Sequence, residues 1–191
     1  SLALGTTNVG TVVSTGAVLQ VQGGIAIGGE PLTLNGAGAA NDGALRNIAG
    51  SNSYAGTITL GGTGVRINAD ADSLTLGGPI AGTGYALAVG GAGSLFVNNA
   101  IGTGAGGSLV KDGFGTLTLS GVNNFTGPLT ISNGVVRATS IAGALGAQGL
   151  LNLAGGSLTI ANDTALTPTR SSITVLNDAT ITSDRLTTDG T

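Results

Sequence analysis

Nine carboxylates are the side chains of this sequence with the widest choice of chemistry. Two carboxyl groups roughly 5–10 Å apart can hydrolyse a glycosidic bond, and stacked strands could bring two of these acids together. Most of them lie beside Gly, Asn or Thr, where Asp caps turns. The chain has no His and no Cys, so the usual general bases and nucleophiles are also missing. We therefore predict no catalytic residue among Glu30, Asp42, Asp70, Asp72, Asp112, Asp163, Asp178, Asp184 and Asp189.

Two short motifs are similar to sites of nucleotide binding and acyl transfer. Residues 102–107 fit G-x-G-x-x-G, but a nucleotide site needs a helix after this motif, and the next residues are strand-like. Residues 108–111 fit S-x-x-K, in which the Ser opens a helix and the Lys lies one turn away. On a strand, residues three apart face opposite sides, so Ser108 and Lys111 cannot meet. We expect a corner at the first motif and a strand at the second.

Two further patterns are similar to calcium sites. Residues 68–73 alternate oxygen ligands, but an EF-hand loop needs Gly at its sixth place and Glu at its twelfth. Those places hold Ser73 and Pro79. Residues 61–67 and 90–96 resemble half of a calcium-binding nonapeptide, with Arg66 and Leu95 where the ligand Asp belongs. We predict no metal site and no cofactor.

The charge distribution excludes several kinds of partner. Only 8% of the residues are charged, the formal net charge is -3, and the six Lys and Arg are scattered along the chain. No basic cluster exists to hold a phosphate backbone, so we expect no nucleic-acid partner. No apolar run approaches the roughly 18 residues of a membrane helix, and we expect no direct membrane insertion.

The elements that carry these residues are indicated by pairs of apolar residues spaced by two. Period two is typical of short strands with one buried face and one wet face. Gly and Asn occupy the intervening corners, where positive φ angles are required. The pairs include Leu19/Val21, Ile58/Leu60, Leu74/Leu76, Leu95/Val97, Leu117/Leu119, Leu129/Ile131 and Leu151/Leu153.

Short strands at this spacing fit a sandwich, a barrel or a β-helix. Three features favour the β-helix: aromatic residues make up only 3% of the chain, Gly-Gly corners outnumber Asn-Gly turns, and an internal repeat is present. Residues 50–60 match residues 121–131 without a gap, at an offset of about three coils of roughly 20–25 residues. We therefore expect a single solenoid over residues 1–191 with about eight or nine coils. Outward Thr residues such as Thr33, Thr59, Thr75 and Thr118 could form stacked ladders, but their irregular spacing disfavours an ice-binding face.

One stretch resembles a known family. Residues 107–137 follow the passenger-associated transport repeat, also called the autotransporter-associated β-strand repeat, with its Lys (Lys111), Gly-x-Gly-Thr-Leu run, Asn (Asn123) and aromatic residue (Phe125). Val135 stands where the family usually has Thr or Leu. Residues 43–67 form a degenerate second copy that lacks the Lys.

The resemblance implies a right-handed parallel β-helix from the passenger of a large bacterial surface or secreted protein. In that family such repeats form a stalk and aid outer-membrane passage. The family's C-terminal membrane barrel is not expected here, because no ten-residue alternating strands carry aromatic girdles.

Three functions remain in competition at this stage. The first is a non-catalytic extracellular stalk of an adhesin-like protein, whose parent could contact surface glycans or host matrix. The second is a self-assembling extracellular fibre that stacks end to end through its β-helix edges, since unpaired edges template further pairing. The third is a carbohydrate-active β-helix enzyme. This function is disfavoured because most of the acids lie beside Gly, Asn or Thr in predicted turns.

Overall fold

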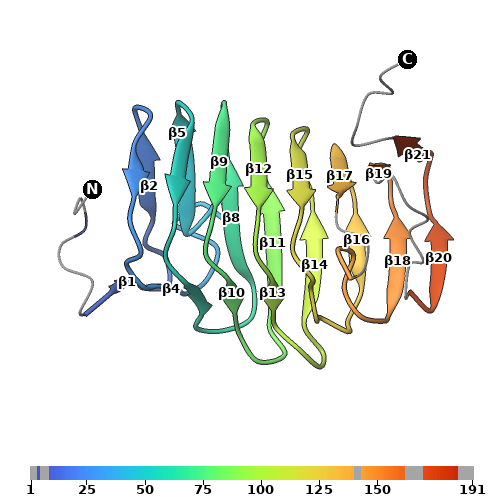
Figure 1. Cartoon of the computed structure of the whole chain (residues 1–191), viewed down its shortest axis with the longest axis horizontal. Helices are drawn as coiled ribbons and strands as arrows, with labels where there is room; N and C mark the ends of the chain where they lie inside the picture. The colour runs from blue at the N-terminus through green and yellow to red at the C-terminus, as the bar shows by residue number, and fades with distance from the viewer. Residues whose placement is uncertain (1–3, 5–8, 140–142, 162–169, 185–191) are drawn as a thin grey trace, which may run out of the picture.

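The protein is a row of parallel strands wound into a solenoid (Figure 1). The computed structural model describes residues 4, 9–139, 143–161 and 170–184. Within these ranges the secondary structure is strand, turn and bend, with no helix and therefore no helix that could span a membrane. Each strand inside a sheet pairs in parallel with strands about one coil before and after it; Leu87, for example, pairs with Val65 and with Leu109. These long-range parallel pairs confirm the β-helix and exclude a sandwich or barrel built from hairpins.

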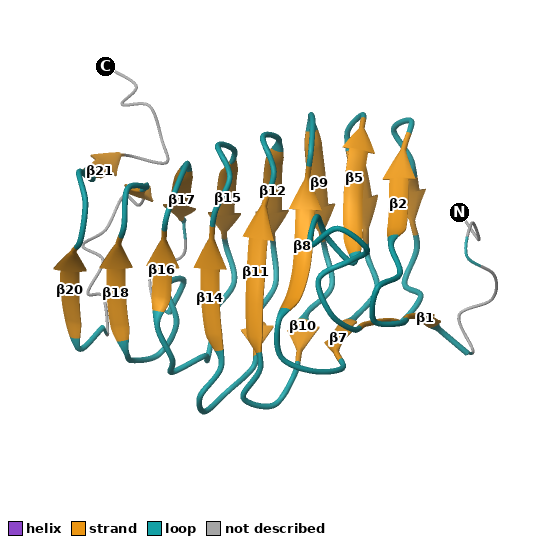
Figure 2. Ribbon diagram, turned by 180° about the vertical axis from the view of Figure 1, so that it is seen from behind, coloured by secondary structure: helices purple, strands orange, loops and turns teal. Residues whose placement is uncertain are grey.

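Three sheets form the sides of the solenoid. Sheet A has five strands, and sheets B and C have eight each. Figure 2 shows sheet B facing the viewer, from β2 to β20. Sheet A consists of β1 (Thr11–Val13), β4 (Leu32–Leu34), β7 (Ile58–Leu60), β10 (Ile80–Ala81) and β13 (Ile101–Gly102). Sheet B consists of β2 (Leu19–Gln22), β5 (Leu45–Ala49), β8 (Val65–Ala69), β11 (Ala86–Gly90), β14 (Ser108–Lys111), β16 (Leu129–Ile131), β18 (Leu150–Leu153) and β20 (Ser172–Val175). Sheet C consists of β3 (Ala26–Ile27), β6 (Asn52–Tyr54), β9 (Ser73–Leu76), β12 (Ser94–Val97), β15 (Thr116–Leu119), β17 (Val135–Ala138), β19 (Ser157–Ala161) and β21 (Ile181–Asp184).

The described residues form about 7 turns, with strands from Thr11 to Asp184. The sequence predicts about eight or nine coils over the whole chain, and this exact count stays a prediction. The coils differ in length: Leu32 pairs with Ile58, while Leu109 pairs with Leu129. The handedness of the coil stays a prediction.

The core is a column of small aliphatic side chains inside the three sheets. In β12 the inward Leu95 and Val97 are at most 1% exposed, while the alternate residues Ser94 and Phe96 are half-buried. The same alternation runs through β9, β14 and β18, as the period-two pairs predicted. Two aromatic rings, Tyr54 and Phe125, also lie inside and are 1% and 0% exposed.

The outward Thr residues do not form one continuous ladder. Thr33 pairs with Thr59 in sheet A, but in sheet C Phe96 separates Thr75 from Thr118, and Arg137 follows Thr118. This interruption agrees with the irregular spacing seen in the sequence.

The two repeat copies occupy different sides of the solenoid. Ile58–Leu60 is β7 of sheet A, whereas the matching Leu129–Ile131 is β16 of sheet B. The offset between the copies is therefore not a whole number of coils, and the gapless match does not place equivalent residues above one another.

Candidate functional site

The coil at residues 107–137 is the part of the chain whose polar side chains are most specifically placed. Its Lys111 lies in β14 and is only 2% exposed. The Lys111 ammonium donates hydrogen bonds to the carbonyl oxygens of Asp112 and Gly113, both at 2.7 Å. A third carbonyl, that of Asn133 in the next coil, lies 3.3 Å away. Lys111 therefore caps the corner after β14 and ties it to the following corner.

Burial lowers the pKa of Lys111 to about 8 from an ordinary value of 10.5. Desolvation is the largest cause, and the nearby Arg66 acts in the same direction, while Asp112 opposes it. The corner thus holds an ammonium group that loses its proton more readily than an exposed lysine.

This burial predicts a rise in stability between pH 8 and pH 10.5. In that window the unfolded chain binds a proton at Lys111 that the folded chain has lost, so the free energy of unfolding increases with pH. The gain over the full window is on the order of 3 kcal/mol. Urea unfolding at about pH 7 and about pH 9.5 should show about 2 kcal/mol of this gain, and Lys111→Met should abolish the difference.

The upper pH limit of that experiment is set by Tyr54. Burial, helped by the charge of Glu30, raises the pKa of Tyr54 from 10.0 to about 12. The folded state then keeps its phenol proton while the unfolded state loses it, so stability falls again as the pH rises from about 10. A pH slope that persists in Lys111→Met would contradict the assignment to Lys111.

Asn123 continues sheet A beyond its last strand. Its side-chain oxygen accepts a hydrogen bond from the backbone N–H of Ile101 in β13, at 2.7 Å. Its side-chain nitrogen donates to the carbonyl of Ala144 in the next coil. Asn123 is 2% exposed. Its side-chain amide therefore takes the place of a backbone peptide group in the ladder and connects three coils.

The aromatic residue of the repeat is covered from a distant segment. Phe125 is fully buried, and the guanidinium of Arg170 lies 5.0 Å from its ring centroid. Arg170 also donates hydrogen bonds to the carbonyls of Leu145, Gly127 and Gln148. Its desolvation by burial lowers the pKa of Arg170 to about 10. Phe125 and Arg170 thus fasten the repeat to the C-terminal coils.

A strip of ion pairs runs along the outer face of sheet B. Arg66 in β8 makes a two-pronged contact with Asp112, two coils further along the chain. The Arg66–Asp112 ion pair passes over Gly90 of the intervening coil. A Cβ at Gly90 would overlap both the Arg66 guanidinium and the Asp112 carboxylate. Arg46 forms ion pairs with Asp42, four residues before it, and with Asp70 of the adjacent coil.

Six of the nine acids considered for catalysis contact other groups of the solenoid. Asp42, Asp70 and Asp112 contact arginines, as does Asp184 through Arg137. Asp72 accepts a hydrogen bond from the backbone N–H of Gly50 at 2.7 Å. Glu30 is 4% exposed and accepts one from the Thr11 hydroxyl at 2.6 Å. Asp178 lies in the exposed turn before β21, and Asp163 and Asp189 are outside the described residues.

The remaining motifs lie at ordinary corners and strands. Residues 102–107 leave β13 and lead directly into strand β14. Ser108 is half-buried and Lys111 is buried on the opposite face of β14. Residues 68–73 turn from β8 into β9. The described residues contain no group of three or more His, Cys, Asp or Glu that could hold a metal ion.

Sequence reasoning missed three contacts of this region. Asn123 extends the hydrogen-bond ladder of sheet A to Ile101, Arg170 covers Phe125, and Arg66 reaches Asp112 over Gly90. Each of these contacts joins residues that are distant in the sequence. The Asn-x-aromatic pattern of the transport repeat was the available signal for the first two contacts, but it carries no information about their partners.

Together these features define a class of protein: a parallel β-solenoid whose polar side chains hold neighbouring coils together. The passenger-associated-transport-repeat family model matches residues 109–138, which confirms the repeat found in the sequence at 107–137. This repeat and the parallel solenoid together fit an autotransporter passenger β-helix. The repeat family implies a secreted or surface-exposed protein. No curated protein and no solved structure matches the chain.

Proposed function

We propose that the chain is a non-catalytic, extracellular stalk segment of an adhesin-like bacterial autotransporter passenger. The observation that carries this proposal is the use of the repeat's own side chains. Lys111, Asn123 and Phe125 are all buried and all directed to neighbouring coils. A repeat whose characteristic residues join coils serves the continuity of the rod. Binding of surface glycans or host matrix then belongs to the parent protein.

The engaged carboxylates support the non-catalytic part of the proposal. A glycosidase needs one carboxyl group that donates a proton and a second that acts as base or nucleophile, both free to face the sugar. Asp42 and Asp70 instead share the guanidinium of Arg46. Two carboxylates that contact the same arginine are not free to face a sugar.

Surface display tests the stalk function. The 191-residue chain, placed between a signal peptide and an autotransporter membrane barrel, should reach the cell surface as a protease-resistant rod. A chain that reaches the surface but is digested as fast as an unfolded control would contradict a stalk role.

A reducing-end assay on acidic and neutral glycans tests the absence of catalysis. We expect no turnover above the rate without protein. Measurable turnover that is lost in Asp70→Asn or Asp72→Asn would overturn the non-catalytic function, and the Arg66→Lys variant serves as a control that leaves all nine acids in place.

A further inference from the structure

The corner between β16 and β17 holds an Asn-Gly pair next to a buried ammonium group. Asn133 and Gly134 leave β16 of sheet B and lead into β17 of sheet C. Both residues are half-buried, so one side of the corner is open to water. Gly134 has a φ angle of 64°, which glycine adopts without strain. Asn is a thermolabile residue, and a glycine after it leaves the next peptide nitrogen without a Cβ to shield it.

The side chain of Asn133 is folded back onto the next peptide group. The backbone N–H of Gly134 donates a hydrogen bond to Oδ1 of Asn133 at 2.8 Å. Oδ1 is bonded to Cγ, so the carbonyl carbon of the side chain lies beside the Gly134 nitrogen. Reacting groups held at such close approach combine far faster than free ones. A bond between this nitrogen and Cγ would close a succinimide ring.

Lys111 polarises the peptide group that would react. Its Nζ lies 3.3 Å from the carbonyl oxygen of Asn133, and that oxygen belongs to the same peptide group as the Gly134 nitrogen. A Cβ at Gly134 would lie only 2.9 Å from Nζ of Lys111, so the positive charge is close to both residues of the pair. A neighbouring positive charge favours the deprotonated form of an acidic group, here the Gly134 N–H. It also stabilises the negative charge that develops as the ring closes.

We propose that Asn133 and Gly134 form a site of intramolecular deamidation that Lys111 promotes. The Gly134 N–H gives its proton to water or hydroxide, and the nitrogen electron pair forms a bond to Cγ of Asn133. The Cγ–Nδ2 bond then breaks, and a proton from water completes the ammonia that leaves. A second water opens the succinimide at either carbonyl, which gives aspartate or isoaspartate without oxidation or reduction. This proposal is independent of the stalk function.

The products change the corner in two different ways. Aspartate places a carboxylate next to the Lys111 ammonium, where a neutral amide stood before. Isoaspartate adds one carbon to the main chain at a crowded position, because a Cβ at Gly134 would already overlap the carbonyl oxygens of Gly113 and Gly115. The isoaspartate product should therefore loosen the stacking of this corner on the coil before it.

The other Asn-Gly pair of the sequence, Asn35-Gly36, is arranged differently. Gly36 has a similar φ angle of 72°. The side-chain nitrogen of Asn35 donates a hydrogen bond to the carbonyl of Val13 at 3.0 Å. The group that must leave as ammonia is thus held by a neighbouring coil. Asn35 therefore serves as an internal control for Asn133.

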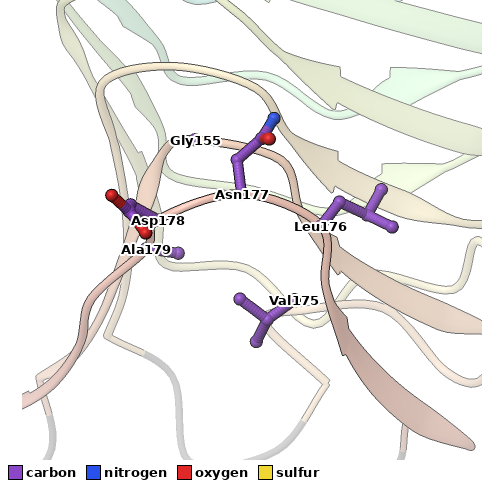
Figure 3. A pocket seen from close by; sticks show the side chains of 6 residues that line it. All are labelled: Gly155, Val175, Leu176, Asn177, Asp178 and Ala179. Carbon is purple, nitrogen blue, oxygen red and sulfur yellow. The ribbon is translucent and has the colours of Figure 1, made fainter.

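Two further asparagines serve as negative controls. The N–H of Ala100 donates to Oδ1 of Asn99 at 2.8 Å, which is the same contact with a Cβ next to the attacking nitrogen. Asn177 lies in the corner that lines the open groove of Figure 3, in the same row of corners between sheets B and C. It is followed by Asp178, and its side-chain nitrogen donates to the carbonyl of Ala154 at 3.2 Å. We expect no measurable conversion of Asn99 or Asn177.

Peptide mapping by mass spectrometry, after incubation of the folded 191-residue chain near neutral pH, tests the proposal. Each converted site gains the mass difference between a carboxyl group and a carboxamide. Trypsin separates the two Asn-Gly sites, since one peptide ends at Arg46 and the other at Arg137. We expect Asn133 to convert at least about tenfold faster than Asn35 in the folded chain. In the chain unfolded in guanidinium chloride, the two sites should convert at similar rates.

Lys111→Met should slow the conversion of Asn133 at least about tenfold and leave that of Asn35 unchanged. The pH profile separates this promotion from a structural effect. Burial and the charge of Arg66 lower the pKa of Lys111 to about 8, while Asp112 opposes them. The wild-type rate should therefore rise with hydroxide below about pH 8 and level off above it, where the ammonium is lost. In Lys111→Met the rate should rise over the whole range.

Three results would overturn the proposal. The first is equal conversion of Asn133 and Asn35 in the folded chain. The second is a Lys111→Met variant that is folded by far-UV circular dichroism and converts Asn133 at the wild-type rate or faster. The third is a permanent loss of ammonia with Lys111 joined to Asn133, which would make the lysine the attacking group instead of the Gly134 nitrogen.

Discussion

Leu117→Asp is expected to unfold the coils around β15. Leu117 is fully buried and lies between Leu95 of the coil before and Val136 of the coil after. Truncation of such a leucine alone costs about 2–5 kcal/mol, and an unpaired carboxylate in the apolar interior adds a further desolvation penalty. Because each coil is stabilised by its neighbours, the damage should extend to the coils on both sides.

Thermal unfolding followed by circular dichroism, together with limited proteolysis, measures this effect. We expect a large loss of strand signal and new cleavage sites in the coils next to β15. Val122→Asp, at a 64% exposed position a few residues away, is the matched control and should keep the wild-type melting profile. If Leu117→Asp melted like the control, the inward orientation of Leu117 would be wrong.

Gly115→Ala is the second change with a large expected effect. Gly115 lies in the corner before β15, and an added Cβ would overlap the carbonyl oxygen of Gly93 in the coil below. That obstacle is backbone, so relief requires the two coils to separate at a corner that Lys111 also holds. Overpacking of this kind costs about 3 kcal/mol, which corresponds to a melting temperature lower by roughly 10 °C in a chain of this length.

Gly62→Ala is a control that separates crowding from the loss of a glycine. Both glycines have φ angles outside the left-handed region, and a Cβ at Gly62 would meet nothing within 4 Å. Gly62→Ala should be neutral or stabilising by up to about 1 kcal/mol, because it reduces the entropy of the unfolded chain. Equal melting temperatures for the two variants would show that the corners are not closely stacked.

The architecture was predictable because the residue pattern within each strand indicates which of its faces is buried. A pair such as Leu95/Val97 identifies an inward face by period two alone, and the Gly-rich corners between pairs exclude long helices. The transport repeat added the parallel coil, since its pattern extends over a complete turn. Both kinds of information are local in the sequence, and both are confirmed in the structure.

The contacts between coils were not predictable in the same way, because they depend on the length of each coil. Leu32 and Ile58 pair across a longer coil than Leu109 and Leu129. A few residues gained or lost in a corner decide which side chain lies above which. The apparent repeat at residues 43–67 illustrates the problem, since its residues fall on another sheet from those that they match. Likewise, nothing near Phe125 in the sequence indicates that Arg170 covers it.

The reach of Arg66 over Gly90 has a consequence for the way the rod responds to load. A stack in which each coil contacts only its neighbours can lose coils one at a time from an end. A link that skips a coil makes three coils open together, because β11 cannot leave while Arg66 and Asp112 remain joined across it. Such coil-skipping links occur in both halves of the described chain. Arg137 in β17 pairs with Asp184 across β19, and Arg170 donates a hydrogen bond to the carbonyl of Gly127 across the coil of β18. Pulled from both ends, the chain should therefore lose its coils in groups instead of one at a time.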